Sequence, residues 1–431
     1  MNASLLTIGD ELLIGQVVNT NGTWIGERLS ALGIEVVRAV TVGDEEERIE
    51  RELRQALGES DLVVLTGGLG PTHDDVTKRA VADELGVELE FHEELLAEVE
   101  GKFAARGRTM AAANRLLAEV PAGFEPLPNP KGTAPGLWFD GEVEGRRRAV
   151  VILPGVPYEM EALMEGAVLP RLLDRLDGAG AVQKTLLTVG KGESDLAEQL
   201  GALDGWLGRA SDGTTLRLAF LPSPGAVRLR LTATGPERAA AGARLAEAER
   251  HVRDRLGDLL FGEGDDTLEA VVGRMLRERD LSLATAESCT GGLLGHLITN
   301  VPGASAYYHG GAVVYGNDQK VLLLRVDPEA IEREGAVSEP VARQLAEGVR
   351  MRLHADIGIA TTGIAGPGGG TPEKPVGTIW LGYADDQGSY AVRLQLATDR
   401  DLNKRLGAMA ALNLVRRQLL RRDRAVAEAE A

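Results

Sequence analysis

One short stretch of the chain, ATAESCTGG at residues 284–292, places two candidate nucleophiles side by side. They are Ser288 and Cys289, the single cysteine of the chain, and Thr290 and a glycine pair follow. An apolar strand pattern precedes the stretch and a helical pattern follows it, so Ser288 falls at a strand-to-helix turn near unpaired helical N–H groups. Such a turn can supply a nucleophile together with a site for an oxyanion. The commoner role of a serine or threonine at this position is to cap the helix.

A second stretch, GGAVVYGNDQK at residues 310–320, contains a base that could activate a serine. Tyr315 stands at the end of an apolar strand pattern, and Lys320 follows five residues later. A serine hydroxyl is a poor nucleophile at neutral pH and needs a base. A lysine that burial has deprotonated can accept the serine proton, and a tyrosine can orient the lysine or relay the proton. The alternative is a surface lysine beside a core tyrosine, and these two stretches alone leave both possibilities open.

A glycine-rich loop, TTGIAGPGGGTPEKPVG at residues 361–377, follows a further strand pattern. Its six glycines and three prolines make a stiff segment whose N–H groups can line a pocket for a phosphate or a carboxamide. Such a loop at the carboxyl end of a strand often carries function, although a plain surface loop is the alternative. Further on, Arg400, Lys404 and Arg405 stand at the start of a helix. They could bind an anion there, although solvated charge is the usual interpretation.

The N-terminal part carries a second set of polar and glycine residues at strand ends. Asp10 and Glu11 follow the first strand pattern, and Asn19 and Asn21 come shortly after as possible helix caps. A glycine-rich turn, TGGLG at residues 66–70, follows another strand and suits a phosphate.

Two adjacent carboxylates, Asp74 and Asp75, come after this turn near the start of a helix. They could hold a divalent cation through oxygen ligands, or they could cap the helix and complement its dipole. Because neighbouring carboxylates repel each other without a cation, the metal site is the favoured interpretation. Further Pro/Gly turns at 128–136 and 153–160 end other strands, and parallel sheets bind ligands at that edge.

Alternation of strand and helix patterns predicts an α/β protein with a parallel sheet in its first part. This first unit extends over residues 1–174. Its expected strands are 4–9, 35–44, 61–68, 134–139 and 147–155, and its expected helices are 20–33, 45–58 and 157–173.

Two glycine-rich breaks divide the rest of the chain. A linker at 174–183 opens a small α+β unit over 175–262, and a polar break at 261–266 leads into a third unit. The third unit spans 263–424 and again alternates strands and helices, with a late hairpin. The last residues, 425–431, are expected to form a frayed tail.

Composition narrows the functional classes. The chain has 431 residues with 47 Lys and Arg against 65 Asp and Glu, a net charge of −18. This charge disfavours direct nucleic-acid binding and acidic membranes, because both need a basic surface. One cysteine excludes an intramolecular disulfide and suits a reducing cytosol. No signal-peptide or membrane-span pattern is present, so we expect a cytoplasmic protein without a membrane partner.

The stretches TAESCTGG, YGNDQK and TTGIAGPGGGTPEKPVGT together resemble the C-terminal domain of the CinA family, which includes nicotinamide mononucleotide deamidases. The resemblance implies a catalytic set of Ser288, Tyr315 and Lys320, with Lys320 as the base and Tyr315 as its partner. Ser288 would attack the carboxamide, ammonia would leave, and water would release the carboxylate, without a cofactor. Cys289, intrinsically the better nucleophile, then becomes a neighbour. The expected substrate-binding residues are Thr290, Gly291, Gly292, Thr362, Gly363, Gly366, Gly368, Gly369, Arg400 and Arg405.

The N-terminal motifs resemble the three-layer molybdopterin-binding-like fold of CinA proteins, and the middle unit resembles their small KH-like domain. Family members are associated with metal-dependent ADP-ribose pyrophosphatase activity, which implies hydrolysis of ADP-ribose to AMP and ribose 5-phosphate. The implied cofactor is a divalent Mg, Mn or Co ion on Asp74 or Asp75. The expected ligand residues are Asp10, Glu11, Asn19, Asn21, Thr66, Gly67, Gly68, Gly70, Lys131, Pro154, Gly155 and Val156.

The sequence thus predicts a pyridine-nucleotide salvage enzyme that acts on nicotinamide mononucleotide at one end and on ADP-ribose at the other. One alternative is a molybdopterin-related enzyme whose C-terminal domain is accessory. A second is a non-catalytic, competence-associated binding protein. A homodimer is expected from the resemblance alone.

Overall fold

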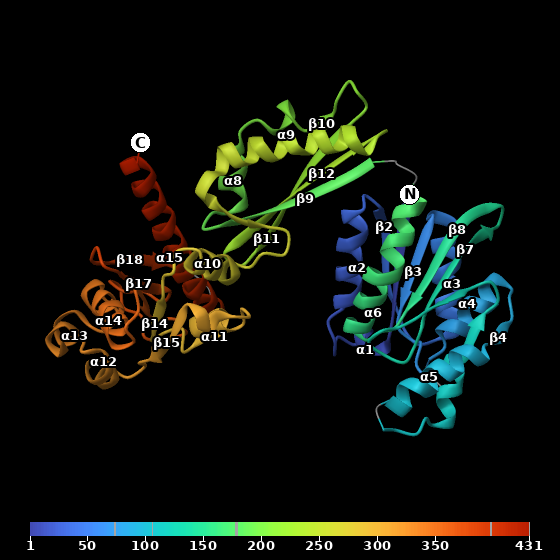
Figure 1. The fold of residues 1–431 in the computed structure, drawn as a ribbon, viewed down its shortest axis with the longest axis horizontal. Coiled ribbons are helices and arrows are strands. Elements are labelled where there is room, and N and C mark those ends of the chain that lie inside the picture. Colours follow the sequence, from blue (N-terminus) through green and yellow to red (C-terminus); the bar gives the residue numbers. More distant parts are fainter. Residues whose placement is uncertain (73–74, 106, 177–179, 397–398, 431) are drawn as a thin grey trace. The chain divides into compact units, whose positions relative to one another are not determined.

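The computed structural model describes residues 1–431 apart from 73–74, 106, 177–179, 397–398 and 431, and describes only the backbone at 180, 204 and 426–430. Figure 1 traces the chain from its N-terminus in blue to its C-terminus in red. Contacts between residues divide the chain into two compact units. The first comprises Met1–Gln183, Arg209–Leu216 and Thr232–Leu245, and the second comprises Lys184–Gly208, Arg217–Leu231 and Ala246–Ala431.

A six-stranded mixed sheet forms the centre of the N-terminal domain. Its strands lie in the order β2 (Glu35–Val42), β1 (Asn2–Ile8), β3 (Leu62–Thr66), β8 (Arg146–Leu153), β7 (Gly136–Val143) and β6 (Glu125–Leu127). The first four run parallel, β7 is antiparallel to β8, and β6 is antiparallel to β7. The predicted α/β class is confirmed, but the parallel arrangement stops at β8. There Glu144 and Gly145, both with positive φ, make a tight hairpin turn from β7.

Helices cover both faces of this sheet and give the three predicted layers. Successive residues of a strand point to opposite faces, so Leu5 packs with α2 and α6, whereas Leu6 packs with α3 and α4. In Figure 1, α2 and α6 lie together on one side, and α3 and α4 lie on the other. The helices are α2 (Thr20–Ala31), α3 (Glu46–Glu59), α4 (Thr77–Leu85), α6 (Pro157–Leu163) and α7 (Leu169–Arg175). A π-helical turn, Met164–Val168, interrupts the helix that was expected over 157–173.

Smaller elements complete this domain. They are α1 (Asp10–Leu13), α5 (Glu93–Ala105), a 3-10 helix (Ala112–Ala118) and the strand pair β4 (Leu89–Phe91) and β5 (Glu119–Pro121).

The middle of the chain forms a five-stranded sheet with two helices. Its strands are β10 (Gly208–Arg209), β11 (Thr215–Ser223), β12 (Ala226–Gly235), β9 (Gly180–Val189) and β13 (Leu260–Glu263), in that order, and its helices are α8 (Glu193–Leu200) and α9 (Arg238–Leu256). Two expectations fail here. Strand β9 already begins within the predicted linker. Strand β13 overlaps the predicted polar break at 261–266, because Leu260 and the residues after it pair with β9.

A five-stranded sheet also forms the centre of the C-terminal domain. Its order is β15 (Tyr308–Val313), β14 (Leu283–Glu287), β16 (Ile357–Gly363), β17 (Thr378–Ala384) and β18 (Ser389–Gln395). The first three run parallel, and β17 and β18 form the predicted antiparallel hairpin. Ser288 follows β14, Tyr315 follows β15 and the glycine-rich loop follows β16. Because the carboxyl ends of parallel strands meet at one edge, the three candidate motifs lie together.

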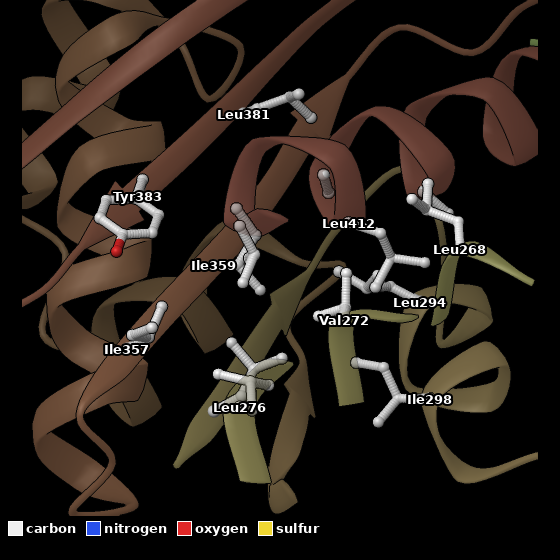
Figure 2. Packing of buried hydrophobic residues seen from close by; sticks show 14 of the residues in the cluster. Leu268, Val272, Leu276, Leu294, Ile298, Ile357, Ile359, Leu381, Tyr383 and Leu412 are labelled. Carbon is white, nitrogen blue, oxygen red and sulfur yellow. The ribbon is translucent and has the colours of Figure 1, made fainter. Parts of the chain in front are cut away.

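Helices pack on both faces of this sheet as well. One face carries α10 (Leu268–Arg277), α11 (Leu293–Thr299) and α15 (Arg400–Glu430), and the other carries α12 (Asn317–Leu324), α13 (Pro328–Glu334) and α14 (Glu339–Arg352). Figure 2 shows Leu276 and Leu412 gathered with Ile357 and Ile359 in the first of these cores. Residues 425–430, predicted as a frayed tail, instead continue α15, since alanine and glutamate favour helix.

Candidate active site

Ser288 stands in the turn between β14 and α11. Its backbone N–H donates to the Thr361 carbonyl at 2.9 Å, which extends the pairing with β16 by one residue beyond the strand. The turn then passes through Gly291 and Gly292, with φ of 64° and 98°, before α11 begins. Both values favour glycine, because a Cβ crowds the left-handed region of the backbone. The Ser288 side chain is 8% exposed and faces a cavity.

The helix after this turn is capped by Glu287, so the alternative in which Ser288 or Thr290 caps it is wrong. The Glu287 carboxylate accepts hydrogen bonds from the backbone N–H groups at the start of α11. The Thr290 hydroxyl instead lies 2.7 Å from that of Thr361. Sequence reasoning missed Glu287, although a carboxylate just before a helix start is a recognisable signal.

The cavity beside Ser288 has a volume of about 190 Å³. It brings together six of the predicted site residues: Ser288, Tyr315, Lys320, Thr362, Gly363 and Arg400. Its other lining residues are Cys289, Asn317, Ala336, Val337 and Ala365. Sequence reasoning missed the last four. Asn317 and Ala365 lie within the recognised motifs, whereas nothing in the local pattern before α14 indicates that Ala336 and Val337 reach this edge of the sheet.

Lys320 is buried in the wall of this cavity, with 1% of its side chain exposed. Its Nζ donates to the Tyr315 carbonyl at 3.0 Å and to Asn317 Oδ1 at 3.4 Å. A neutral amine has two N–H donors and one lone pair, so these two bonds satisfy its donors and leave the lone pair free to accept a proton. Burial lowers the pKa of Lys320 below that of an exposed lysine, which favours this neutral form. The exposed-lysine alternative is therefore wrong.

Tyr315 contacts Lys320 through its backbone rather than through its phenol. The side chain is 61% exposed, so it is not a core tyrosine. Its hydroxyl accepts a hydrogen bond from Arg400 Nη2 at 3.0 Å, and Arg400 Nη1 donates to the Gly366 carbonyl at 2.7 Å. Tyr315 therefore orients the lysine with its carbonyl and the arginine with its phenol.

Cys289 lines the same cavity as Ser288, but its side chain also belongs to a hydrophobic core. The side chain is 5% exposed and packs in the hydrophobic core beneath α10, α11 and α15. Burial raises the pKa of the Cys289 thiol to about 11, so the thiol stays protonated at neutral pH. The nucleophilic thiolate that makes cysteine reactive is therefore scarce at this position.

Other predicted residues lie outside the cavity. Among the described residues, these are Thr290, Gly291, Gly292, Gly366, Gly368, Gly369 and Arg405. Arg405 forms an exposed ion pair with Asp401 at 2.7 Å, one helical turn away. Of the basic cluster at the start of α15, Arg400 alone lines the cavity, because the residues of a helix face different directions.

A smaller cavity of about 90 Å³ lies at the carboxyl edge of the N-terminal sheet. Its lining includes five predicted ligand residues: Glu11, Asn19, Asn21, Thr66 and Gly155. The remaining lining residues are Thr7, Ile8, Leu12, Val17, Val18, Thr20 and Pro157.

Two asparagines form hydrogen bonds at this edge of the sheet. Asn19 caps α2, as the sequence suggested, because its Oδ1 accepts from the Gly22 N–H at 2.9 Å. Asn21 instead donates through Nδ2 to Thr66 Oγ1 at 3.1 Å and to the Gly155 carbonyl at 2.8 Å. Its Oδ1 is buried and accepts no hydrogen bond from the described residues. A ligand hydroxyl or amino group would satisfy this acceptor.

The predicted metal ligands do not form a set among the described residues. Asp74 lies outside those residues. The Asp75 carboxylate accepts from the Thr72 N–H at 2.7 Å and from the Thr72 hydroxyl at 2.6 Å. Nowhere in the described chain do three or more His, Cys, Asp or Glu side chains converge as a metal would require. The described residues therefore do not fit a metal centre by themselves.

The other predicted N-terminal residues lie outside the smaller cavity. Asp10 Oδ1 accepts from the Asp44 N–H at 3.3 Å. Gly67 allows two backbones to approach, since a Cβ there would meet the Ile8 carbonyl oxygen at 2.1 Å. Also outside its lining are Gly68, Gly70, Lys131, Pro154 and Val156.

The fold and the site define a three-domain α/β protein with a molybdopterin-binding-like domain, a KH-like domain and a CinA C-terminal domain. Residues 4–174 match the family model of the probable molybdopterin binding domain, residues 183–262 that of the damage-inducible protein CinA KH domain, and residues 265–419 that of the CinA C-terminal domain.

Relatives extend the match over nearly the whole chain. A CinA-like protein of Salinibacter ruber is 51% identical over 420 residues, covering 97% of this chain and 100% of that protein. A putative competence-damage inducible protein of Symbiobacterium thermophilum is 44% identical and covers 97% and 99%. A crystal structure of the protein CinA from Thermoplasma acidophilum is 42% identical, covers 40% of this chain and 97% of that chain, and gives a TM-score of 0.36. The chain belongs to the CinA family.

No helix in the described part of the chain is both long enough and apolar enough to span a membrane.

Proposed function

We propose that the C-terminal domain is an amidohydrolase that converts nicotinamide mononucleotide to nicotinate mononucleotide and ammonia. The observation that carries this proposal is that Ser288 and the buried amine of Lys320 line one cavity. Cys289 lines it too, but its side chain packs against the core and burial raises the pKa of its thiol. A serine with a lysine base is an established arrangement for acyl transfer without histidine.

In the first step, Ser288 Oγ adds to the carboxamide carbon while its proton passes to the neutral Lys320 amine. The carbon–nitrogen bond then breaks, and the Lys320 ammonium returns the proton to the departing nitrogen, which leaves as ammonia. Water adds to the resulting ester and gives a proton to Lys320. The ester bond breaks, Lys320 reprotonates Ser288, and the carboxylic acid product ionises. One lone pair on Lys320 serves every proton transfer.

Arg400 supports a nucleotide rather than a simple amide as the substrate. It lines the cavity, and its two described bonds, to Gly366 and Tyr315, use two of the five donors of a guanidinium group. The remaining donors suit a phosphate. Arg400→Gln is expected to raise KM for nicotinamide mononucleotide at least about tenfold and to change kcat much less, because a charged hydrogen bond to substrate contributes about 1.5–3 kcal/mol. Steady-state kinetics with nicotinamide mononucleotide and with nicotinamide riboside, which lacks the phosphate, test this. Equal losses for both substrates would contradict a phosphate contact.

The role of Cys289 provides a matched test of the nucleophile. Cys289→Ala is expected to keep ammonia release within about threefold of the unaltered protein, because the thiol is protonated and the change removes one buried sulfur. Thermal unfolding of the same variant separates lost stability from lost chemistry. A folded but inactive Cys289→Ala protein would overturn the assignment to Ser288.

The second proposed activity is hydrolysis of ADP-ribose to AMP and ribose 5-phosphate by the N-terminal domain, with a divalent Mg, Mn or Co ion. The free acceptor of Asn21 beside Thr66 and Glu11 supports a ligand with hydroxyl or amino donors, which ADP-ribose offers. Of the two predicted ligands Asp74 and Asp75, Asp75 is the one that the structure describes, and the ion would need further ligands.

A chelator is expected to abolish AMP formation from ADP-ribose and to leave ammonia release from nicotinamide mononucleotide unchanged. The reason is that the proposed deamidase uses the Ser288 hydroxyl and the Lys320 amine alone. Both reactions are measured in one preparation, with EDTA and with added Mg, Mn or Co. Loss of both activities, or of neither, would contradict this division. Binding of molybdopterin in preference to ADP-ribose would favour a molybdopterin-related enzyme, and the absence of any turnover would favour a binding protein.

A further inference from the structure

We propose that Glu287 is a positioning residue for the nucleophile, a role that rests on the proposed amidohydrolase function of Ser288. Glu287 ends β14, is 2% exposed, and accepts three hydrogen bonds from the backbone. Its Oε2 accepts from the N–H groups of Gly292 at 2.9 Å and Leu294 at 3.0 Å, and its Oε1 accepts from Gly295 at 2.8 Å. All three donors lie at the start of the helix that follows Ser288.

This arrangement releases the hydroxyl groups of the turn from capping. The first N–H groups of a helix need acceptors from outside it, and a serine or threonine side chain usually supplies one. Here the N-cap residue is Gly292, which has no side chain, and the acceptor comes from the strand. A buried carboxylate is well suited to this place, because charge-assisted bonds are strong and the helix dipole favours an anion. Ser288 can therefore face the cavity.

Two hydrogen bonds hold the ends of the turn that carries Ser288. At one end the Ser288 N–H donates to Thr361, and at the other the Gly292 N–H donates to Glu287. Within the described chain, the N–H groups of residues 289–291 between them donate to no backbone carbonyl. The Glu287 carboxylate thus fixes the turn that carries the nucleophile, and a displacement of about 1 Å at such a site costs about a hundredfold in rate.

The test compares Glu287→Gln with a matched cap variant in the full-length protein. Glutamine keeps the size of glutamate but replaces one acceptor oxygen with an NH₂ group that faces backbone donors. The control is Asp327→Ala, which removes the cap of α13 in the same domain, where Asp327 Oδ1 accepts from the Glu329 N–H at 3.0 Å. We expect Glu287→Gln to lower kcat for ammonia release about a hundredfold with KM within about threefold. Asp327→Ala should lose stability but keep kcat within about twofold.

A second measurement does not depend on the substrate. Phenylmethylsulfonyl fluoride sulfonylates activated serines, and mass spectrometry locates the modified residue. We expect Ser288 to be modified in the unaltered protein and in Asp327→Ala, and at least about tenfold more slowly in Glu287→Gln.

The outcomes separate the positioning role from the proposed function. Unchanged kcat and an unchanged rate of sulfonylation in Glu287→Gln would overturn the positioning role. So would equal losses of kcat in Glu287→Gln and in an equally destabilised Asp327→Ala, because Glu287 would then be a structural cap only. If the unaltered protein releases no ammonia but Glu287 still governs the sulfonylation of Ser288, the choice of substrate fails while the positioning role stands. Absence of sulfonylation in every variant would overturn both the activated serine and its positioning.

Discussion

Ser288→Ala is expected to lower kcat for ammonia release from nicotinamide mononucleotide by at least about ten-thousandfold, because removal of a covalent nucleophile costs most of the rate enhancement. The Ser288 hydroxyl makes no hydrogen bond to another described residue, so the loss of stability should stay below about 1 kcal/mol. Continuous ammonia detection gives kcat, and rapid-quench kinetics should show that the burst from the acyl-enzyme disappears. Thermal unfolding of the variant checks that the domain is intact.

The adjacent position supplies the control for this experiment. Cys289→Ala deletes one heavy atom from the next side chain of the same turn and should remain active. A Ser288→Ala protein that keeps normal ammonia release beside an inactive Cys289→Ala protein would reverse the assignment. Retention of activity in both variants would place the reaction outside this turn.

Lys320→Met is expected to lower kcat for the same reaction by about a hundredfold to ten-thousandfold, the usual range for loss of a general base. Methionine has nearly the volume of the lysine stem but no lone pair to accept the Ser288 proton. Lys320→Arg should be similarly impaired, because a guanidinium stays protonated throughout the working range of pH. Single-turnover kinetics distinguish slow acylation, the expected defect, from slow product release.

The pH dependence gives an independent check on Lys320. Because the neutral amine is the active form, kcat should rise with pH as the ammonium loses its proton, and should then level off. Burial lowers the Lys320 pKa, so this rise should lie at lower pH than the titration of an exposed lysine. The rise should vanish in Lys320→Met. Persistence of the same titration in that variant would show that another group is the base.

Local pattern was sufficient to predict the α/β class and the grouping of the motifs. Apolar runs followed by helical periodicity placed Ser288, Tyr315 and the glycine-rich loop at the ends of successive strands, and β14, β15 and β16 are indeed parallel neighbours. Parallel pairing forces the carboxyl ends of such strands to one edge, so the sequence could indicate a shared site. The sequence could not indicate where each strand or helix begins and ends. Strand β13 and the last turns of α15 were missed, because short polar segments obtain their structure from pairing or from the helix they continue.

The chemistry of each residue at this edge depended on contacts that spacing does not reveal. The sequence alone determined which groups are available: a serine, a lysine, an arginine and a glycine-rich backbone. Only the tertiary structure decided that Glu287 caps α11 in place of Ser288, that Lys320 donates to the backbone of Tyr315, and that Thr72 donates to one oxygen of the Asp75 carboxylate. The physical reason is that several acceptors compete for each hydrogen-bond donor. Each donor pairs with the acceptor that the folded backbone brings within about 3 Å of it. In these three cases the partners are only three to five residues apart, in turns whose course is set by the strands and helices that they connect.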